Sequence, residues 1–153
     1  MTTRLQPTIR QLDQAEIEAM LGRHHVGRIA YTFHDRVGIE PISFVYADRG
    51  IFCRTSSGAK LETLRHHPWV AFEIDEVDGP YDWRSVVAHG TAQLLSLDGT
   101  GFERDRYVRA VELLRRLEPE TFETADPVPF RTTVLRINVD ELTGREAQSG
   151  RTR

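Results

Sequence analysis

Residues 54–60, Arg-Thr-Ser-Ser-Gly-Ala-Lys, bring together groups that can bind an anion. The run lies between an apolar stretch typical of a strand and a stretch typical of a short helix. Hydroxyl groups and free backbone N–H groups at a helix start attract anions, and Lys60, the one lysine among twenty basic side chains, adds a compact positive charge. We call residues 54–60 the phosphate loop, because they predict a binding site for the phosphate of a nucleotide-like cofactor.

A simpler interpretation of the phosphate loop stays open from these residues alone. In that interpretation Ser56 or Ser57 only caps the helix, and Lys60 is solvated. The helices and strands predicted around the loop help to choose between a phosphate site and a simple helix cap.

The sequence predicts three helices and six strands around the loop. The helices are expected over residues 14–21, 59–66 and 98–117, and the first begins with a capping-box pattern at Asp13 and Glu16. The strands are expected over residues 26–33, 37–46, 51–54, 69–74, 83–95 and 132–139. Pro41 predicts a sheet edge or a bulge, and Gly90 predicts a bulge or a bend.

Short strands joined mostly as hairpins predict a mainly β chain of the α+β class, whose sheet closes into a small barrel with helices outside. Residues 118–129 are expected to form an irregular connection. With 153 residues and 17.5 kDa, the chain is expected to form a single domain over residues 1–144, followed by a disordered tail over residues 145–153.

Composition and charge narrow the class of protein. The 20 basic and 23 acidic side chains nearly balance, which predicts a soluble globular protein that does not bind nucleic acid. No apolar stretch approaches the roughly 20 residues of a membrane span, and Met1–Arg4 lack the apolar segment of a secretory signal. We therefore expect no membrane insertion and a cytoplasmic location.

Few other residues suggest chemistry. Cys53, the only cysteine, excludes an intrachain disulfide and is expected to be a structural thiol. No histidine has a partner at a spacing typical of a metal site or a nucleophilic triad. The acidic residues between positions 73 and 78 are expected to face water. The sequence therefore predicts no metal site, and the catalytic residues remain unassigned.

Five runs of the sequence, in this order and spacing, are typical of one known family. The runs are Val26-Gly27-Arg28-Ile29-Ala30-Tyr31, Pro41-Ile42-Ser43-Phe44, Thr55-Ser56-Ser57-Gly58-Ala59-Lys60-Leu61, Leu64-Arg65-His66-His67-Pro68-Trp69-Val70 and Trp83-Arg84-Ser85-Val86-Val87-Ala88-His89-Gly90-Thr91-Ala92. With these runs the sequence resembles the FMN-binding split β-barrel family related to pyridoxamine 5′-phosphate oxidase, nearest its branch of nitroimidazole-resistance proteins. The resemblance covers about residues 12–139, and it depends on the order and spacing of the runs because no single run is diagnostic.

The resemblance implies a six-stranded split β-barrel with Greek-key-like connections and peripheral helices. It also implies a homodimer that binds FMN at the subunit interface. The residues implied to hold the FMN phosphate are Thr55, Ser56, Ser57 and Lys60, with Arg54 as a second cation.

The flavin ring is implied to lie along the second predicted strand. Backbone groups of Pro41, Ile42, Ser43 and Phe44 would meet its polar edge, although Phe44 as plain core remains an alternative. Trp83 and Arg84 would reach the flavin rim from the partner subunit. The alternative for this pair is a barrel-mouth tryptophan beside a solvated arginine.

The activity implied by the resemblance is that of an FMN-dependent oxidoreductase, which passes hydride or electrons between a reduced nicotinamide and a small acceptor such as a nitroaromatic compound. A pyridoxamine phosphate oxidase is not expected. Residues 40–45 carry no basic side chain, Ala59 stands where that enzyme has an arginine, and its C-terminal arginine–histidine pattern is missing.

Three alternatives to this activity stay open. A deazaflavin-dependent reductase of the same fold would also want a basic phosphate loop. A haem-handling barrel would need an axial ligand, and none is evident. A flavin-binding or purely structural dimer would have no catalytic turnover.

Overall fold

The computed structural model describes residues 6–150 as seven strands and three helices. The strands are β1 (Thr8–Gln11), β2 (Val26–Phe33), β3 (Arg36–Ala47), β4 (Gly50–Thr55), β5 (Trp69–Gly79), β6 (Asp82–Leu95) and β7 (Thr133–Gln148). The helices are α1 (Gln14–Arg23), α2 (Ala59–His66) and α3 (Phe102–Leu117). The expectations for Met1–Arg4 and for residues 151–153 lie outside the described residues.

The strands form one antiparallel sheet in the order β1-β7-β4-β3-β2-β5-β6, and an additional pairing of β7 with β6 closes six of them into a barrel. The sheet therefore has seven strands, one more than the sequence predicted. The seventh, β1, pairs with the end of β7 from Thr8–Gln148 to Gln11–Arg145. All four residues of β1 are exposed, so no alternation of apolar and polar side chains signals this strand.

Gly90 produces the bulge that the sequence predicted. The register between β6 and β7 shifts between His89 and Gly90. A Cβ atom at Gly90 would lie 2.0 Å from the carbonyl oxygen of Asn138, so only glycine allows the two backbones to approach this closely.

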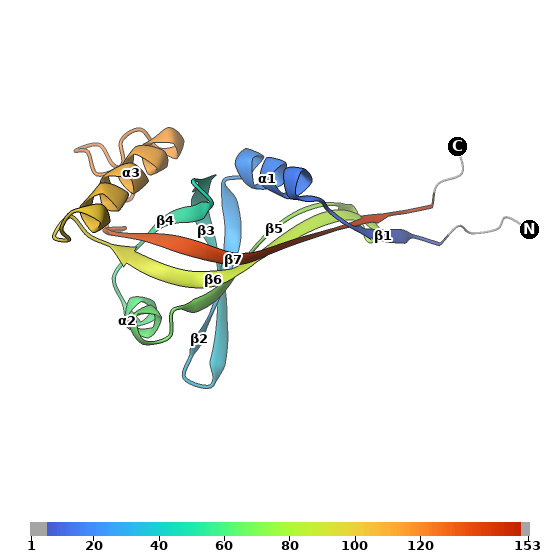
Figure 1. Cartoon of the computed structure of the whole chain (residues 1–153), viewed down its shortest axis with the longest axis horizontal. Coiled ribbons are helices and arrows are strands. Elements are labelled where there is room, and N and C mark those ends of the chain that lie inside the picture. The colour runs from blue at the N-terminus through green and yellow to red at the C-terminus, as the bar shows by residue number, and fades with distance from the viewer. Residues whose placement is uncertain (1–5, 151–153) are drawn as a thin grey trace, which may run out of the picture.

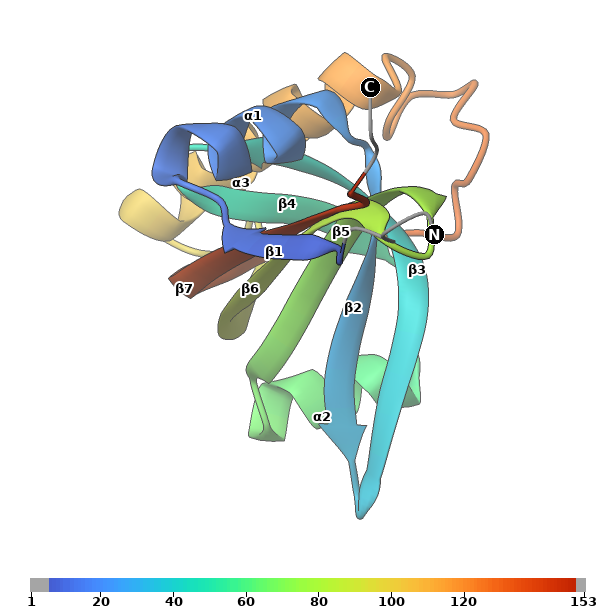
Figure 2. The same cartoon turned by 90° about the vertical axis from the view of Figure 1, so that its right-hand side faces the viewer.

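The helices lie outside the barrel, with α1 and α3 on one side and α2 at the opposite end (Figures 1 and 2). The main core fills the barrel and includes Ile29, Phe72 and Ile137. A second core joins α3 to β4 and β7 through residues such as Phe52 and Leu113. The predicted capping box of α1 is present, since the backbone N–H of Glu16 donates to Asp13 Oδ1 over 2.8 Å.

The C-terminal segment corrects one prediction. Residues 145–148 were expected to be disordered, but they belong to β7 and pair with β1, and residues 145–147 pair with β6 as well. Glu146 and Ala147 are buried there. The prediction failed because the strand continues through charged and polar residues, which are held by pairing on both sides and not by an apolar pattern.

The acidic residues between positions 73 and 78 differ in part from the prediction that they face water. They belong to β5, which extends to Gly79, and of the four only Asp78 is exposed. Glu73 and Asp75 are half-buried and lie 3.5 Å and 3.6 Å from Arg28 Nη1. Burial, with the nearby Asp75 carboxylate, raises the pKa of Glu73 to about 7.

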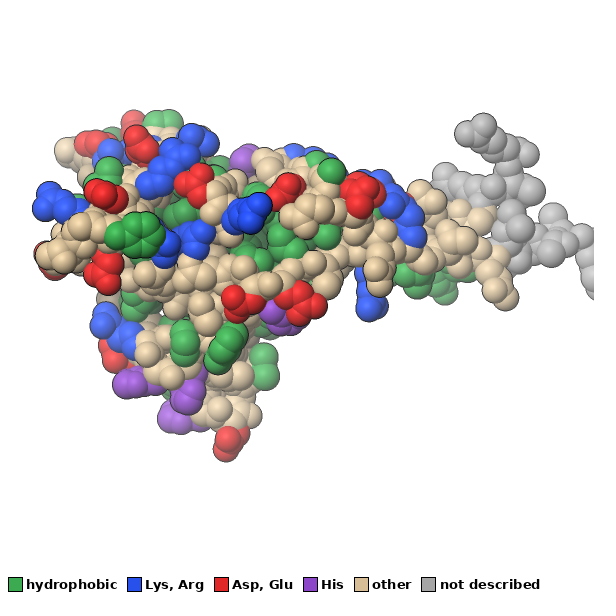
Figure 3. Space-filling model, viewed as in Figure 1, with side chains coloured by type: hydrophobic (Ala, Val, Ile, Leu, Met, Phe, Trp, Pro, Cys, Tyr) green, Lys and Arg blue, Asp and Glu red, His purple; other side chains and the backbone are tan. Residues whose placement is uncertain are grey.

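The structure also shows the surroundings of Cys53 and the distribution of charged side chains. Cys53 is fully buried, and burial raises the pKa of its thiol to about 12, which confirms a structural thiol. Within residues 6–150, no cluster of histidine, cysteine and acidic side chains could hold a metal ion, and no helix is long and apolar enough to cross a membrane. On the face shown in Figure 3, basic and acidic side chains are interspersed without an extended basic patch.

Candidate functional site

A cavity of about 320 Å³ lies between the phosphate loop, β3 and the segment that precedes β7. It brings together seven of the residues predicted for the cofactor site, namely Pro41, Ile42, Arg54, Thr55, Ser56, Ser57 and Lys60. Its other lining residues are Glu40, Gly58, Ala59, Phe130 and Arg131. We call this space the phosphate cavity.

The start of α2 bears on the simpler interpretation of the phosphate loop. The N-cap residue is Gly58, and no side chain caps the helix. Ser56 and Ser57 are exposed, and their hydroxyls make no hydrogen bond within residues 6–150. The capping interpretation is therefore wrong, and both hydroxyls line the cavity without another partner in this part of the chain.

Lys60 is not solvated, because its side chain is only 17% exposed and forms an ion pair with Glu40. Its ammonium lies 6.0 Å from the centre of the Tyr31 ring. Burial raises the pKa of Tyr31, and the Glu40 carboxylate raises it further. Gly38 leaves room for the Tyr31 ring, since a Cβ atom at position 38 would lie 2.7 Å from Tyr31 Cζ.

Glu40 places a negative charge on the wall of the phosphate cavity. A bound phosphate would compete with this carboxylate for Lys60 and would be repelled by it. If the cavity holds the FMN phosphate that the resemblance implies, Glu40→Gln should tighten FMN binding by about threefold or more, measured by titration of flavin fluorescence. Glu62→Gln is the matched control, because Glu62 lies exposed on α2 and does not line the cavity. Weaker binding by Glu40→Gln alone would show that Glu40 positions Lys60 and does not oppose the phosphate.

β3 presents an open edge beside the phosphate cavity. Its residues 36–43 pair with β2, and its residues 44–47 pair with β4. The edge of residues 36–43 that faces away from β2 thus has no strand partner in the described chain. Pro41 lies on this stretch, which confirms its predicted edge position.

Ser43 lines a second cavity of about 450 Å³, whose walls combine polar residues with apolar side chains from β2, α3 and the segment before β7. This second cavity shares Arg54 and Arg131 with the phosphate cavity, so the two spaces adjoin. Phe44 is different, because its side chain is fully buried and packs edge-to-face on Phe72 with ring centres 4.8 Å apart. Phe44 is therefore core, as the alternative interpretation held.

Arg54 borders both cavities, but its donors are engaged within the chain. Its guanidinium pairs with Asp126 through a contact of 2.6 Å, and it donates to the carbonyl oxygens of Val128 and Arg131 over 2.9 Å and 3.0 Å. It also lies 4.6 Å from the centre of the Phe122 ring. The arginine predicted as a second cation for the phosphate thus holds the connection between α3 and β7.

The sequence profile of a known family, described as pyridoxamine 5′-phosphate oxidase, matches residues 13–146. The chain belongs to the pyridoxamine 5′-phosphate oxidase family. An uncharacterized protein of Rhizobium meliloti is 27% identical over 151 residues, which cover 93% of this chain and 97% of the relative.

Solved structures of similar proteins support the fold assigned to this family member. An FAD-binding protein from Mesorhizobium loti is 26% identical with a TM-score of 0.71, and the match covers 92% of this chain and 99% of that protein. A structure from Bacteroides thetaiotaomicron that is named for 5-nitroimidazole antibiotic resistance is 17% identical with a TM-score of 0.70, covering 95% and 91% of the two chains. The predicted resemblance and the predicted split-barrel fold are confirmed.

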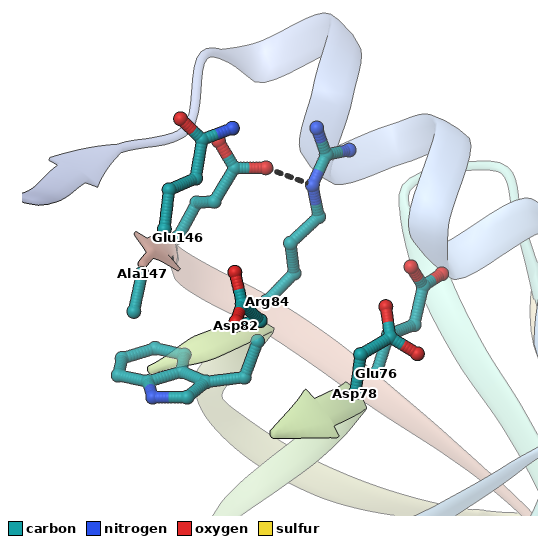
Figure 4. A pocket seen from close by; sticks show the side chains of 8 residues that line it. Glu76, Asp78, Asp82, Arg84, Glu146 and Ala147 are labelled. Carbon is teal, nitrogen blue, oxygen red and sulfur yellow. Dashed lines mark hydrogen bonds and ion pairs between the residues drawn. The ribbon is translucent and has the colours of Figure 1, made fainter. Parts of the chain in front are cut away.

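Trp83 and Arg84 do not line the phosphate cavity of their own chain. They border a separate pocket at the arm formed by β1 and the ends of β5, β6 and β7 (Figures 1 and 4). Arg84 forms an ion pair there with the buried Glu146, which also accepts from Arg10 Nε over 2.8 Å. Arg84 is therefore not simply solvated.

The sequence did not identify three residues that shape the site of this family member. Glu40 lines the phosphate cavity and pairs with Lys60, and its place directly before Pro41 was the available signal. Phe130 and Arg131 lie in an irregular connection, where no periodic pattern tells which side chains face a cavity.

Proposed function

We propose that the chain is a flavoprotein that holds FMN by its phosphate in the phosphate cavity and acts as an oxidoreductase. The observation that carries this proposal is the convergence of three hydroxyls, an ammonium and two arginines on one cavity beside an open strand edge. Membership in the pyridoxamine 5′-phosphate oxidase family supports a flavin, as does the FAD-binding relative.

The residues of the cavity fit a flavin phosphate. The hydroxyls of Ser56 and Ser57 are free to donate, as are the first two backbone N–H groups of α2, whereas those of Leu61 and Glu62 donate to Gly58. Lys60 supplies positive charge. The open edge of β3 continues from this cavity to Ser43 and would orient the polar edge of the ring. The apolar side chains of the second cavity would exclude water from the bound group.

A bound flavin supplies hydride or electron transfer, whereas the chain supplies binding, orientation and access. We propose a reduced nicotinamide as the donor and a small molecule, such as a nitroaromatic compound, as the acceptor. Pyridoxamine phosphate is not the proposed substrate, because β3 carries no basic side chain between Glu40 and Val45.

We further propose a homodimer in which the Trp83 and Arg84 end of one subunit completes the cofactor site of the other. The two residues line a pocket that shares no residue with the phosphate cavity of their own chain, and this separation supports the arrangement. Light scattering of the purified protein gives the oligomeric state, and a monomer that still binds FMN tightly would contradict the proposal.

The first experiment is the visible absorption spectrum of the protein purified without added cofactor, followed by mass analysis of the released chromophore. We expect a yellow protein that releases FMN. Release of FAD would keep the flavoprotein assignment but change the cofactor, and a deazaflavin would be recognised by its mass. A colourless protein that takes up neither FMN nor FAD on titration would overturn the proposed function.

A further inference from the structure

The segment from Asp126 to Arg131 forms a wall of both cavities. Phe130 and Arg131 line the phosphate cavity, and Pro127, Val128 and Arg131 line the second cavity. The segment has no regular secondary structure, but Arg54 fixes its backbone through the carbonyl oxygens of Val128 and Arg131. The backbone of Arg131 is therefore held in place, and the residue lines both cavities where they adjoin.

The guanidinium of Arg131 has no partner within the described chain. Its backbone N–H donates to Val128 over 3.0 Å and its carbonyl oxygen accepts from Arg54, but its side chain makes no hydrogen bond or ion pair with residues 6–150. Most other arginines that face a cavity or a neighbouring element are paired, as Arg54 is with Asp126 and Arg84 with Glu146. Arg131 is thus free to bind an incoming anion.

The charges around the phosphate cavity make this arginine important. Glu40 neutralises Lys60, and Asp126 neutralises Arg54. Among the described lining residues, Arg131 therefore carries the one positive charge that no carboxylate compensates. A dianionic phosphate needs such an uncompensated charge, and the planar fork of a guanidinium can donate two hydrogen bonds to it.

We propose that Arg131 is the second cation of the phosphate site and binds the flavin phosphate together with Lys60. The inference rests on the proposed function, since it assumes a phosphorylated flavin in this cavity. Arg131 takes the role that the sequence predicted for Arg54, while Arg54 holds in place the segment that carries it.

The test compares FMN with riboflavin, which has the same ring but no phosphate. For Arg131→Gln we expect the Kd of FMN to rise by about tenfold or more, with the Kd of riboflavin unchanged. Arg131→Lys should lie between the wild type and Arg131→Gln, because it keeps the charge but loses the fork. Arg104→Gln removes an exposed arginine of α3 that lines neither cavity, and it should bind both ligands as the wild type does.

The outcomes separate this inference from the function on which it rests. A wild type that binds FMN, together with an Arg131→Gln variant of equal FMN affinity, would overturn the role of Arg131 alone. Equal weakening of FMN and riboflavin would also overturn it, because the arginine would then act on the ring or on the fold. A wild type that bound neither ligand would reject the proposed function and this inference with it. Thermal melts that agree between the variants exclude misfolding as the cause.

Discussion

Replacing Asp126 by asparagine is expected to lower the melting temperature of the protein by about 10 °C, because it removes the charge that pairs with a buried arginine. Both carboxylate oxygens of Asp126 accept a hydrogen bond from Arg54. In addition, Oδ2 accepts from the backbone N–H of Phe122 over 2.9 Å, and Oδ1 accepts from the backbone N–H of Val128 over 3.0 Å. An asparagine would direct its NH₂ group at donors, so at least one buried N–H would lose its acceptor. Thermal unfolding followed by circular dichroism measures the effect.

The matched control for Asp126→Asn is Glu123→Gln in the same connection. Glu123 pairs with Arg115 over 3.0 Å, but both side chains are exposed, so this variant should melt within about 2 °C of the wild type. If both variants melted alike, the buried pair between Arg54 and Asp126 would not stabilise the fold as argued.

The contribution of Asp126 also depends on pH. The hydrogen bonds from Arg54 lower the pKa of Asp126 to about 2, and the backbone N–H groups of Phe122 and Val128 act in the same direction. An unfolded aspartate has a pKa of about 4, so the contribution is fully present above that pH and is lost as the pH falls through about 2. The difference in stability between the wild type and Asp126→Asn should therefore shrink between these values, which denaturant titrations across the pH range can measure.

Lys60→Ala is expected to weaken FMN binding by about 1–3 kcal/mol, the range of a charge-assisted hydrogen bond. The loss has two parts, because the variant removes an ammonium from the phosphate cavity and leaves the Glu40 carboxylate there without its partner. The double variant Lys60→Ala with Glu40→Gln should regain part of the affinity. Isothermal titration calorimetry with FMN measures these differences.

Riboflavin serves as the control ligand for Lys60→Ala, since it lacks the phosphate that the ammonium is proposed to bind. Its affinity should not change. If FMN affinity stayed unchanged as well, the assignment of Lys60 to the phosphate would be wrong. If both affinities fell together, Lys60 would act through the packing of Tyr31 and not through the phosphate.

Much of the fold could be predicted from the sequence, because periodic patterns and turn residues mark most of its elements. The helix over residues 59–66 and the strand over residues 26–33 agree with α2 and β2 to the residue. The parts that failed, β1 and the end of β7, are exposed or rich in charged residues. They form strands because each provides backbone partners to the other, and such pairing between the two ends of a chain leaves no local signal.

The site could be predicted only where its residues are close in the sequence. The phosphate loop reads as one run, so its hydroxyls and Lys60 could be grouped before the structure was known. The other residues that set the net charge of the phosphate cavity are distant in the sequence. Glu40 comes from β3, and Arg131 comes from the connection before β7. A basic residue next to such a run can either bind the phosphate or pair with a carboxylate of the protein. Arg54 does the second, since it pairs with the buried Asp126.

The position of β7 has a consequence for synthesis of the protein on the ribosome. β7 is the last described strand, and it pairs with β1, β4 and β6, so the barrel cannot close before residues 133–148 have emerged. Until then β4 and β6 each keep an unpaired edge that could associate with another chain. A nascent chain that stalls before Thr133 therefore exposes those edges to association with another chain.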